Sequence, residues 1–132
     1  MMSNSMNSES SESTKALRIL VVEDEGDPRD TLANVLRDIG HTVSVAASMA
    51  EALKAIDLDK FDVILSDISL PDGSSYPLIV EAKRRLPLIR AVALVGFGTE
   101  PDAHLSGEAG FDFHLTRPLD FRELRTVLAS LS

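Results

Sequence analysis

Two groups of carboxylates follow apolar, strand-like runs in the sequence. Glu23, Asp24 and Glu25 follow the first run, and Asp67 follows the third. Like charges a few ångströms apart raise one another's pKa, so such a cluster stays ionised only with a cation among them. With no cysteine and no suitably placed histidine, an oxygen-only site favours a hard ion such as Mg²⁺. Position alone leaves open the alternative that these acids are solvated loop residues.

The chain is acidic overall. Its 132 residues carry 21 Asp and Glu against 13 Lys and Arg, a formal net charge of -8. This balance disfavours unaided binding to nucleic acid or to an anionic membrane, so we expect protein or cation partners. The lack of cysteine excludes disulfides and thiol nucleophiles and fits a reducing compartment. No apolar run approaches the roughly 20 residues of a membrane span, and no secretion signal is evident, so we expect a cytoplasmic protein.

The length and the composition predict a tail followed by one domain. Residues 1–14 include six serines and two glutamates and no apolar residue other than methionine, so they bury too little surface to offset the entropy of ordering. We therefore expect residues 1–15 to form a flexible Ser-rich tail and residues 16–132 to fold as a single domain.

Five short apolar runs that alternate with amphipathic segments predict the strands of an α/β domain. The runs cover residues 17–22, 42–46, 61–66, 90–95 and 111–115. Continuous apolar runs are typical of parallel strands that are covered on both faces. Parallel strands need crossover connections, so the pattern predicts an open, doubly wound sheet with helices on both faces.

Helix boundaries are predicted from capping signals. Asp27 before Pro28 predicts the start of the first helix, which is expected to end near Gly40. Capping boxes predict two further helix starts, and they consist of Ser48 with Glu51 and Asp120 with Glu123. A third helix is expected over residues 76–86. A fourth, from Thr99 to Ala109, has a thin apolar face and is expected to be the least stable element.

The carboxyl ends of parallel strands lie at one edge of such a sheet, where ligands bind. In either common strand order, the ends of the first and third strands can be close neighbours. Glu23, Asp24 and Asp67 are then expected to converge. The turn signal Pro71-Asp72-Gly73 follows shortly after Asp67.

Three segments together resemble the receiver domain of two-component response regulators, over about residues 16–132. They are ILVVEDE at 19–25, DVILSDISLPDG at 62–73 and TRPL at 116–119. The resemblance implies a flavodoxin-like, chemotaxis-regulator-like fold with strand order 2-1-3-4-5. It also implies that Asp67 accepts a phosphoryl group from a histidine kinase or a phosphotransfer protein. Glu23, Asp24, Asp67 and the backbone carbonyl of Ser69 would then hold Mg²⁺.

Two residues depart from the family's pattern. Val95 stands where receivers have a Thr or Ser whose hydroxyl bonds the phosphoryl group, and Arg117 stands where they have Lys. Arginine keeps the charge but is planar and longer, so the exchange is not conservative at a tight site. His114 occupies the usual aromatic switch position and either titrates near neutrality or packs at the surface. His41 and His104 are given no role.

Two functions remain open on this basis. The first is a phosphorylatable receiver with altered switching, and the second is a degenerate receiver that docks a protein without phosphate control. In both, the chain is a signalling module and not an enzyme; the motifs of haloacid dehalogenases and nucleotide-binding loops are not met. A downstream protein or a second copy would bind the face of the fourth helix, fifth strand and fifth helix. A stand-alone receiver and a segment of a hybrid kinase are both left open.

Overall fold

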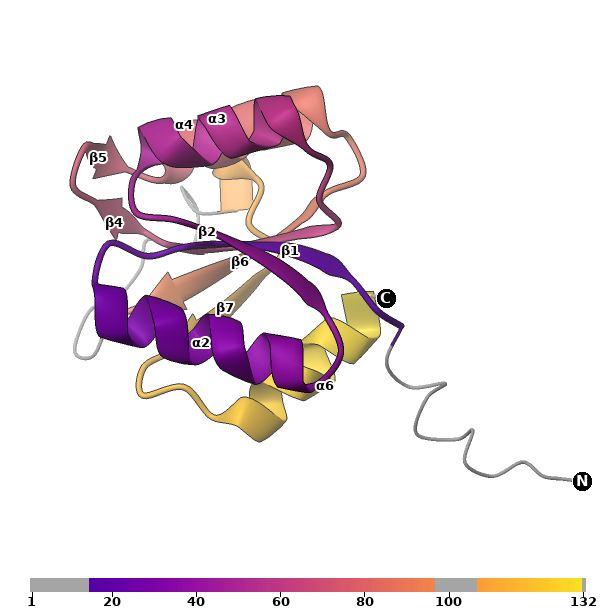
Figure 1. The fold of residues 1–132 in the computed structure, drawn as a ribbon. Helices are drawn as coiled ribbons and strands as arrows, with labels where there is room; N and C mark the ends of the chain where they lie inside the picture. The colour runs from indigo at the N-terminus through magenta and orange to yellow at the C-terminus, as the bar shows by residue number, and fades with distance from the viewer. Residues whose placement is uncertain (1–14, 97–106, 132) are drawn as a thin grey trace, which may run out of the picture.

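A five-stranded parallel sheet forms the centre of the molecule (Figure 1). The computed structural model describes residues 15–96 and 107–131. The strand order is β2-β1-β3-β6-β7, which confirms the order 2-1-3-4-5 expected from the resemblance. The strands are β1 (Arg18–Val22), β2 (Thr42–Ala46), β3 (Val63–Asp67), β6 (Arg90–Val95) and β7 (Phe113–Thr116).

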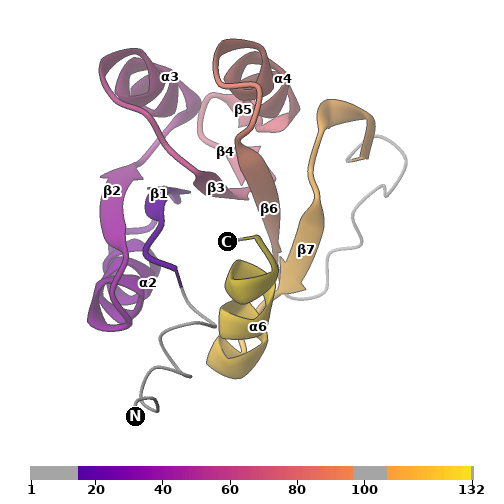
Figure 2. The same ribbon diagram turned by 90° about the vertical axis from the view of Figure 1, so that its right-hand side faces the viewer.

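Helices cover both faces of the sheet, as the strand pattern predicts (Figure 2). On one face lie α2 (Gly26–Asp38) and α6 (Phe121–Leu131), and on the other lie α3 (Met49–Leu58) and α4 (Tyr76–Arg85). Residues 107–109 are helical; the remainder of the predicted fourth helix, with His104, lies outside the described residues, as does the predicted tail over residues 1–14. Among the described helices, none is long and apolar enough to cross a membrane.

The continuous apolar sequence of β1 follows from its place between two helical layers. Ile19 and Val21 pack in the core beneath α2 and α6, while Leu20 and Val22 pack in the core beneath α3 and α4. All four side chains are fully buried. A strand that is covered on both faces has no polar side, because successive side chains point to opposite faces.

The capping signals are correct for two helices and wrong for one. Ser48 Oγ accepts a hydrogen bond from the Glu51 N–H at 3.1 Å, and Asp120 Oδ1 accepts from the N–H groups of Arg122 and Glu123. The prediction that Asp27 caps α2 is wrong: the helix begins at Gly26 after an extended Glu25, and no side chain caps it. Asp27 lies in the first turn instead, where its charge favours the helix N-terminus.

A short hairpin follows β3 where the sequence predicted only a turn. Its strands are β4 (Ser69–Leu70) and β5 (Gly73–Ser74), and Gly73 has φ of +127°, which favours glycine. Both oxygens of Asp72, at the tip, accept hydrogen bonds from the start of α3, from the N–H groups of Met49 at 3.0 Å and Ala50 at 3.1 Å. These bonds lower the pKa of Asp72 and fix the hairpin to α3.

Buried His41 makes the stability of the fold depend on pH. Its Nδ1 accepts a hydrogen bond from the Leu17 N–H at 3.0 Å, and within the described part of the chain its Nε2 has no partner. Burial lowers the pKa of His41 from 6.5. The unfolded chain therefore takes up a proton before the folded chain does, so this contribution to stability is present above pH 6.5 and is lost as the pH falls below it.

Between about pH 7.5 and about pH 5.5, we expect His41 to lower the stability of wild-type protein. Glu23, whose pKa is raised to about 7, acts in the opposite direction and does so in wild-type protein and in the His41 variant alike. His41→Asn keeps an acceptor near the position of Nδ1 and does not titrate, so on acidification it should gain stability relative to wild-type protein. The measurement is urea unfolding of both proteins at both pH values, and equal changes in the two proteins would contradict a role for His41.

Candidate functional site

The predicted acidic residues converge at the carboxyl edge of the sheet. Glu23 follows β1 directly, and Asp67 is the last residue of the neighbouring strand β3. One carboxylate oxygen from each of Glu23, Asp24 and Asp67 lies within 4.8 Å of the other two. Glu23 is 3% exposed and Asp67 is 8% exposed, while Asp24 is exposed to solvent. Two buried acids and one exposed acid therefore share one small site; Glu23 and Asp67 are not solvated loop residues, whereas Asp24 is exposed.

Glu23 is held in place from several sides. Its N–H donates to the carbonyl of Ala46 in β2 at 3.0 Å, which extends the pairing of β1 and β2 past the last residue of β1. Its Oε2 accepts a hydrogen bond from the Glu25 N–H at 3.1 Å. Burial and the nearby Asp67 carboxyl raise the pKa of Glu23 to about 7, against the lowering effects of the Glu25 N–H and of Arg117.

Arg117 contacts both buried acids. Its Nη1 donates to Asp67 Oδ1 at 2.5 Å, and its Nη2 donates to Glu23 Oε1. The side chain is only 26% exposed. Its backbone N–H donates to the carbonyl of Val95 at 2.9 Å, so the residue is placed by the pairing of β6 with β7. The sequence predicted a cation at this position but not that one guanidinium would join two carboxylates.

Val95 brings a buried apolar side chain to the same edge. It is the last residue of β6, is 2% exposed and pairs with Thr116 in β7. The position therefore offers no hydroxyl. Ser69 opens the β4–β5 hairpin two residues after Asp67, and its role as a carbonyl ligand stays a prediction.

His114 lies on β7 in a row of aromatic rings. Its ring centre is 6.2 Å from that of Phe111 at a tilt of 49°, and Phe111 packs edge-on against Tyr76 of α4. The row joins β7 to α4 across the sheet edge. This arrangement is the packing role that the sequence left as one of two possibilities for His114.

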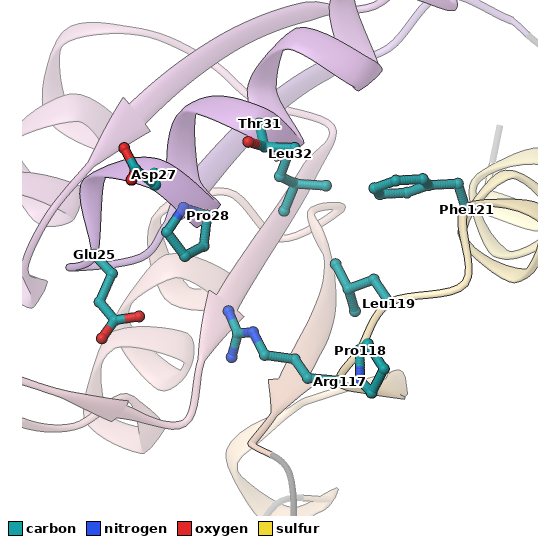
Figure 3. Close-up of a pocket in the computed structure, with 9 residues that line it drawn as sticks. All are labelled: Glu25, Asp27, Pro28, Thr31, Leu32, Arg117, Pro118, Leu119 and Phe121. Carbon is teal, nitrogen blue, oxygen red and sulfur yellow. The ribbon is translucent and has the colours of Figure 1, made fainter.

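A pocket of about 470 Å³ adjoins the acidic cluster (Figure 3). It lies between the first turns of α2 and the segment that joins β7 to α6. Its walls are mainly apolar, and Arg117, Glu25 and Asp27 supply its charged groups. Its full lining is Glu25, Asp27, Pro28, Thr31, Leu32, Arg117, Pro118, Leu119 and Phe121. The pocket therefore opens beside the same guanidinium that contacts Asp67.

Chemically, the cluster offers a buried carboxylate that can act as a nucleophile, further carboxylates that can hold a hard cation, and a fixed positive charge. Sequence reasoning found each of these residues. Besides the double contact of Arg117, it missed two hydrogen-bonded contacts near the site: the bond of the Glu25 N–H to Glu23 and the bonds of Asp72 to the start of α3. The only available signal for the second was an aspartate before glycine in a turn.

Comparison with known proteins finds similar sequences and similar solved structures. The transcriptional regulatory protein TcrA of Mycobacterium tuberculosis is 32% identical over 116 residues, which cover 88% of this chain but 46% of TcrA. The chain thus spans about half the length of that relative. The crystal structure of a CheY-like receiver domain protein from Methanospirillum hungatei matches with a TM-score of 0.81 at 28% identity, covering 89% of this chain and 94% of that one.

A third match is a response regulator protein from Burkholderia pseudomallei, whose crystal structure is described as holding a phosphorylated aspartic acid, a calcium ion and citrate. It has a TM-score of 0.78 at 29% identity, covering 86% of this chain and 68% of that one. The family model described as the response regulator receiver domain matches residues 19–129. Because this match takes in nearly the whole chain, the protein belongs to the family of response regulator receiver domains.

Proposed function

We propose that the protein is a phosphoacceptor in a two-component relay, and that Asp67 accepts the phosphoryl group with the help of Mg²⁺. The observation that carries this proposal is the convergence of Glu23, Asp24 and Asp67 at the carboxyl edge of β1 and β3. A domain that only docks a partner has no need of three clustered carboxylates, two of them buried, since taking like charges out of water is costly even with Arg117 beside them.

The donor set fits a magnesium ion. All the donors are oxygens, and two of the three carboxylates are withdrawn from bulk water, as suits a hard cation bound by a few carboxylates together with water and phosphate oxygens. Glu23, Asp24 and Asp67 would hold the ion, with the carbonyl of Ser69 as a further ligand. When bound, the ion neutralises charge on the phosphoryl oxygens and aligns them with the attacking carboxylate.

The reaction transfers one phosphoryl group. A carboxylate oxygen of Asp67 forms a bond to phosphorus, the bond from phosphorus to the histidine nitrogen of the donor breaks, and that nitrogen keeps the electron pair and regains a proton. Arg117 contacts Asp67 Oδ1 in the unphosphorylated form, and its positive charge beside the site favours the negatively charged product. The product is an acyl phosphate on Asp67, so the chain acts as a signalling phosphoacceptor and not as an enzyme.

The comparisons support this proposal at the level of the family. The structure from Burkholderia pseudomallei is described as carrying a phosphorylated aspartate and a divalent cation, the chemistry proposed here. For partners, we propose a histidine kinase or phosphotransfer protein as the donor, and we propose that this chain itself is cytoplasmic. A downstream protein or a second copy would bind the face that includes β7 and α6. Direct binding to nucleic acid or membrane is not part of the proposal.

Two observations favour the second candidate, a docking module without phosphate control. Val95 supplies no hydroxyl to a phosphoryl group, and Arg117 already satisfies charges on Glu23 and Asp67 without any ion. A partner could then bind one fixed form of the domain. The two candidates differ in whether Mg²⁺ and a phosphodonor act on the protein.

Asp24→Asn is expected to lower the affinity for Mg²⁺ about tenfold or more, because ion binding loses one of its three charged carboxylates. The measurement is calorimetric titration of the protein with MgCl₂. Asp38→Asn is the matched control, since Asp38 is an exposed acid at the other end of α2 and lies outside the cluster. Equal affinities in the two variants would contradict the metal assignment, and the absence of any Mg²⁺ binding by wild-type protein would favour the docking module.

A further inference from the structure

The Glu23 carboxylate has both oxygens engaged. Oε1 accepts a hydrogen bond from Nη2 of Arg117, and Oε2 accepts one from the Glu25 N–H. Asp67 Oδ1 accepts from Nη1 of the same guanidinium. Arg117 therefore contacts oxygens of two of the three carboxylates that the proposed function assigns to the metal ion.

We propose that Arg117 is an internal counter-ion of the acidic site, and that Mg²⁺ and the Arg117 guanidinium exclude each other from it. This inference rests on the proposed function for the identity of the ion. The site then has two forms: one closed by Arg117, and one open to the ion with the guanidinium displaced. The apparent affinity for Mg²⁺ is set by the balance between the two forms.

Charge and geometry both make the two cations exclusive. A planar guanidinium has donors in a fixed fork that engages two carboxylates at once, and here it does so with Glu23 and Asp67. A divalent ion would need the same partly buried oxygens and would face a fixed positive charge within the cluster. A lysine ammonium is a compact point charge on a flexible stem, so it blocks the site less completely.

The structure also offers a place for the displaced guanidinium. Arg117 lines the pocket of about 470 Å³ beside the cluster, and Glu25 and Asp27 line the same pocket (Figure 3). Both acids are exposed. A guanidinium that left Glu23 and Asp67 would find two carboxylates in a space that is already open. The pocket thus makes the open form accessible without unpacking the core.

The test is calorimetric titration with MgCl₂ of wild-type protein, Arg117→Met and Arg29→Met. Arg29 is the matched control, because it lies close to the cluster and donates to the carbonyl of Glu23 at 3.3 Å, but its ion pair is with Asp30. We expect Arg117→Met to bind Mg²⁺ about tenfold more tightly than wild-type protein, the factor that corresponds to losing one charge-assisted competitor. Arg29→Met should change the affinity much less.

A double-mutant cycle that combines Glu25→Gln with Arg117→Met tests where the displaced guanidinium binds. If Arg117 pairs with Glu25 in the open form, Glu25→Gln should weaken Mg²⁺ binding more in the wild-type background than in the Arg117→Met background. Equal effects in both backgrounds would overturn this part of the inference. Far-UV circular dichroism checks the fold of each variant. If Arg117→Met does not fold, Arg117→Lys serves in its place, with a smaller gain in affinity expected.

The outcomes separate the inference from the function on which it rests. If Arg117→Met and wild-type protein bind Mg²⁺ equally well while Asp24→Asn binds it weakly, the competition is wrong and the metal site stands. If Arg117→Met gains no more than Arg29→Met, the effect is general electrostatics and the inference fails. If neither wild-type protein nor Arg117→Met binds Mg²⁺, both the inference and the proposed metal site fail.

Discussion

Asp67→Asn is expected to abolish phosphoryl incorporation. The side-chain amide has nearly the shape of the carboxylate but lacks the anionic oxygen that attacks phosphorus. Asp67 ends the buried strand β3 and is only 8% exposed, so the isosteric exchange should leave the strand and its pairing with β6 in place. The measurement is a time course of incorporation from acetyl phosphate in the presence of Mg²⁺.

The matched control is Asp62→Asn. Asp62 lies just before the other end of the same strand and accepts a hydrogen bond from the Arg18 N–H at 2.8 Å, far from the carboxyl edge of the sheet. This variant should incorporate phosphate like wild-type protein. Full labelling of Asp67→Asn, or an equal loss in both variants, would show that phosphate is accepted elsewhere or that the loss reflects folding.

Val95→Thr is expected to increase the stabilisation that phosphorylation gives the domain. A hydrogen bond to a charged group contributes about 1.5 to 3 kcal/mol, and the threonine hydroxyl would supply one to the phosphoryl group from the end of β6. Before phosphorylation, the same hydroxyl at a position that is 2% exposed lacks that partner and is expected to lower stability by about 1 to 3 kcal/mol. The measurement is the free energy of unfolding with and without acetyl phosphate and Mg²⁺.

Val95→Ala separates the hydroxyl from the change in packing. It removes side-chain volume without adding a donor, so it should lower stability equally in the two states. An increase of the phosphorylation effect in Val95→Thr but not in Val95→Ala would show that the missing hydroxyl limits the effect of phosphorylation on stability. An unaltered response in Val95→Thr would point to Arg117 or to the output face.

Most of the fold could be predicted from the sequence because its central strands are buried on both faces. Residues 19–22 of β1 and residues 63–65 of β3 are all apolar and buried, and that pattern distinguishes strands from amphipathic helices. Local backbone geometry was harder to predict. Asp27 carries the residue type of a cap, but α2 starts at Gly26, and the β4–β5 hairpin is too short to show periodicity.

The site could be predicted as a set of residues but not as a set of contacts. The carboxylates at the ends of β1 and β3 had to meet once the strands were neighbours. The contact of Arg117 with both Glu23 and Asp67 depends on where β7 ends relative to Val95. The spacing of residues in the sequence does not determine that position. The exchange of Lys for Arg was visible in the sequence; its effect on the ion site required the positions of Glu23 and Asp67.

Intact-mass spectrometry of wild-type protein tests the central claim most directly. The protein is incubated with acetyl phosphate and Mg²⁺, and in parallel with acetyl phosphate and a chelator. The account predicts a gain of one phosphoryl group with Mg²⁺, little gain with the chelator, and loss of the added mass on treatment with hydroxylamine, which cleaves acyl phosphates. Two results together would contradict the account: no gain in mass with either acetyl phosphate or a phosphorylated histidine donor, and no binding of Mg²⁺. The docking module without phosphate control would then be the remaining function.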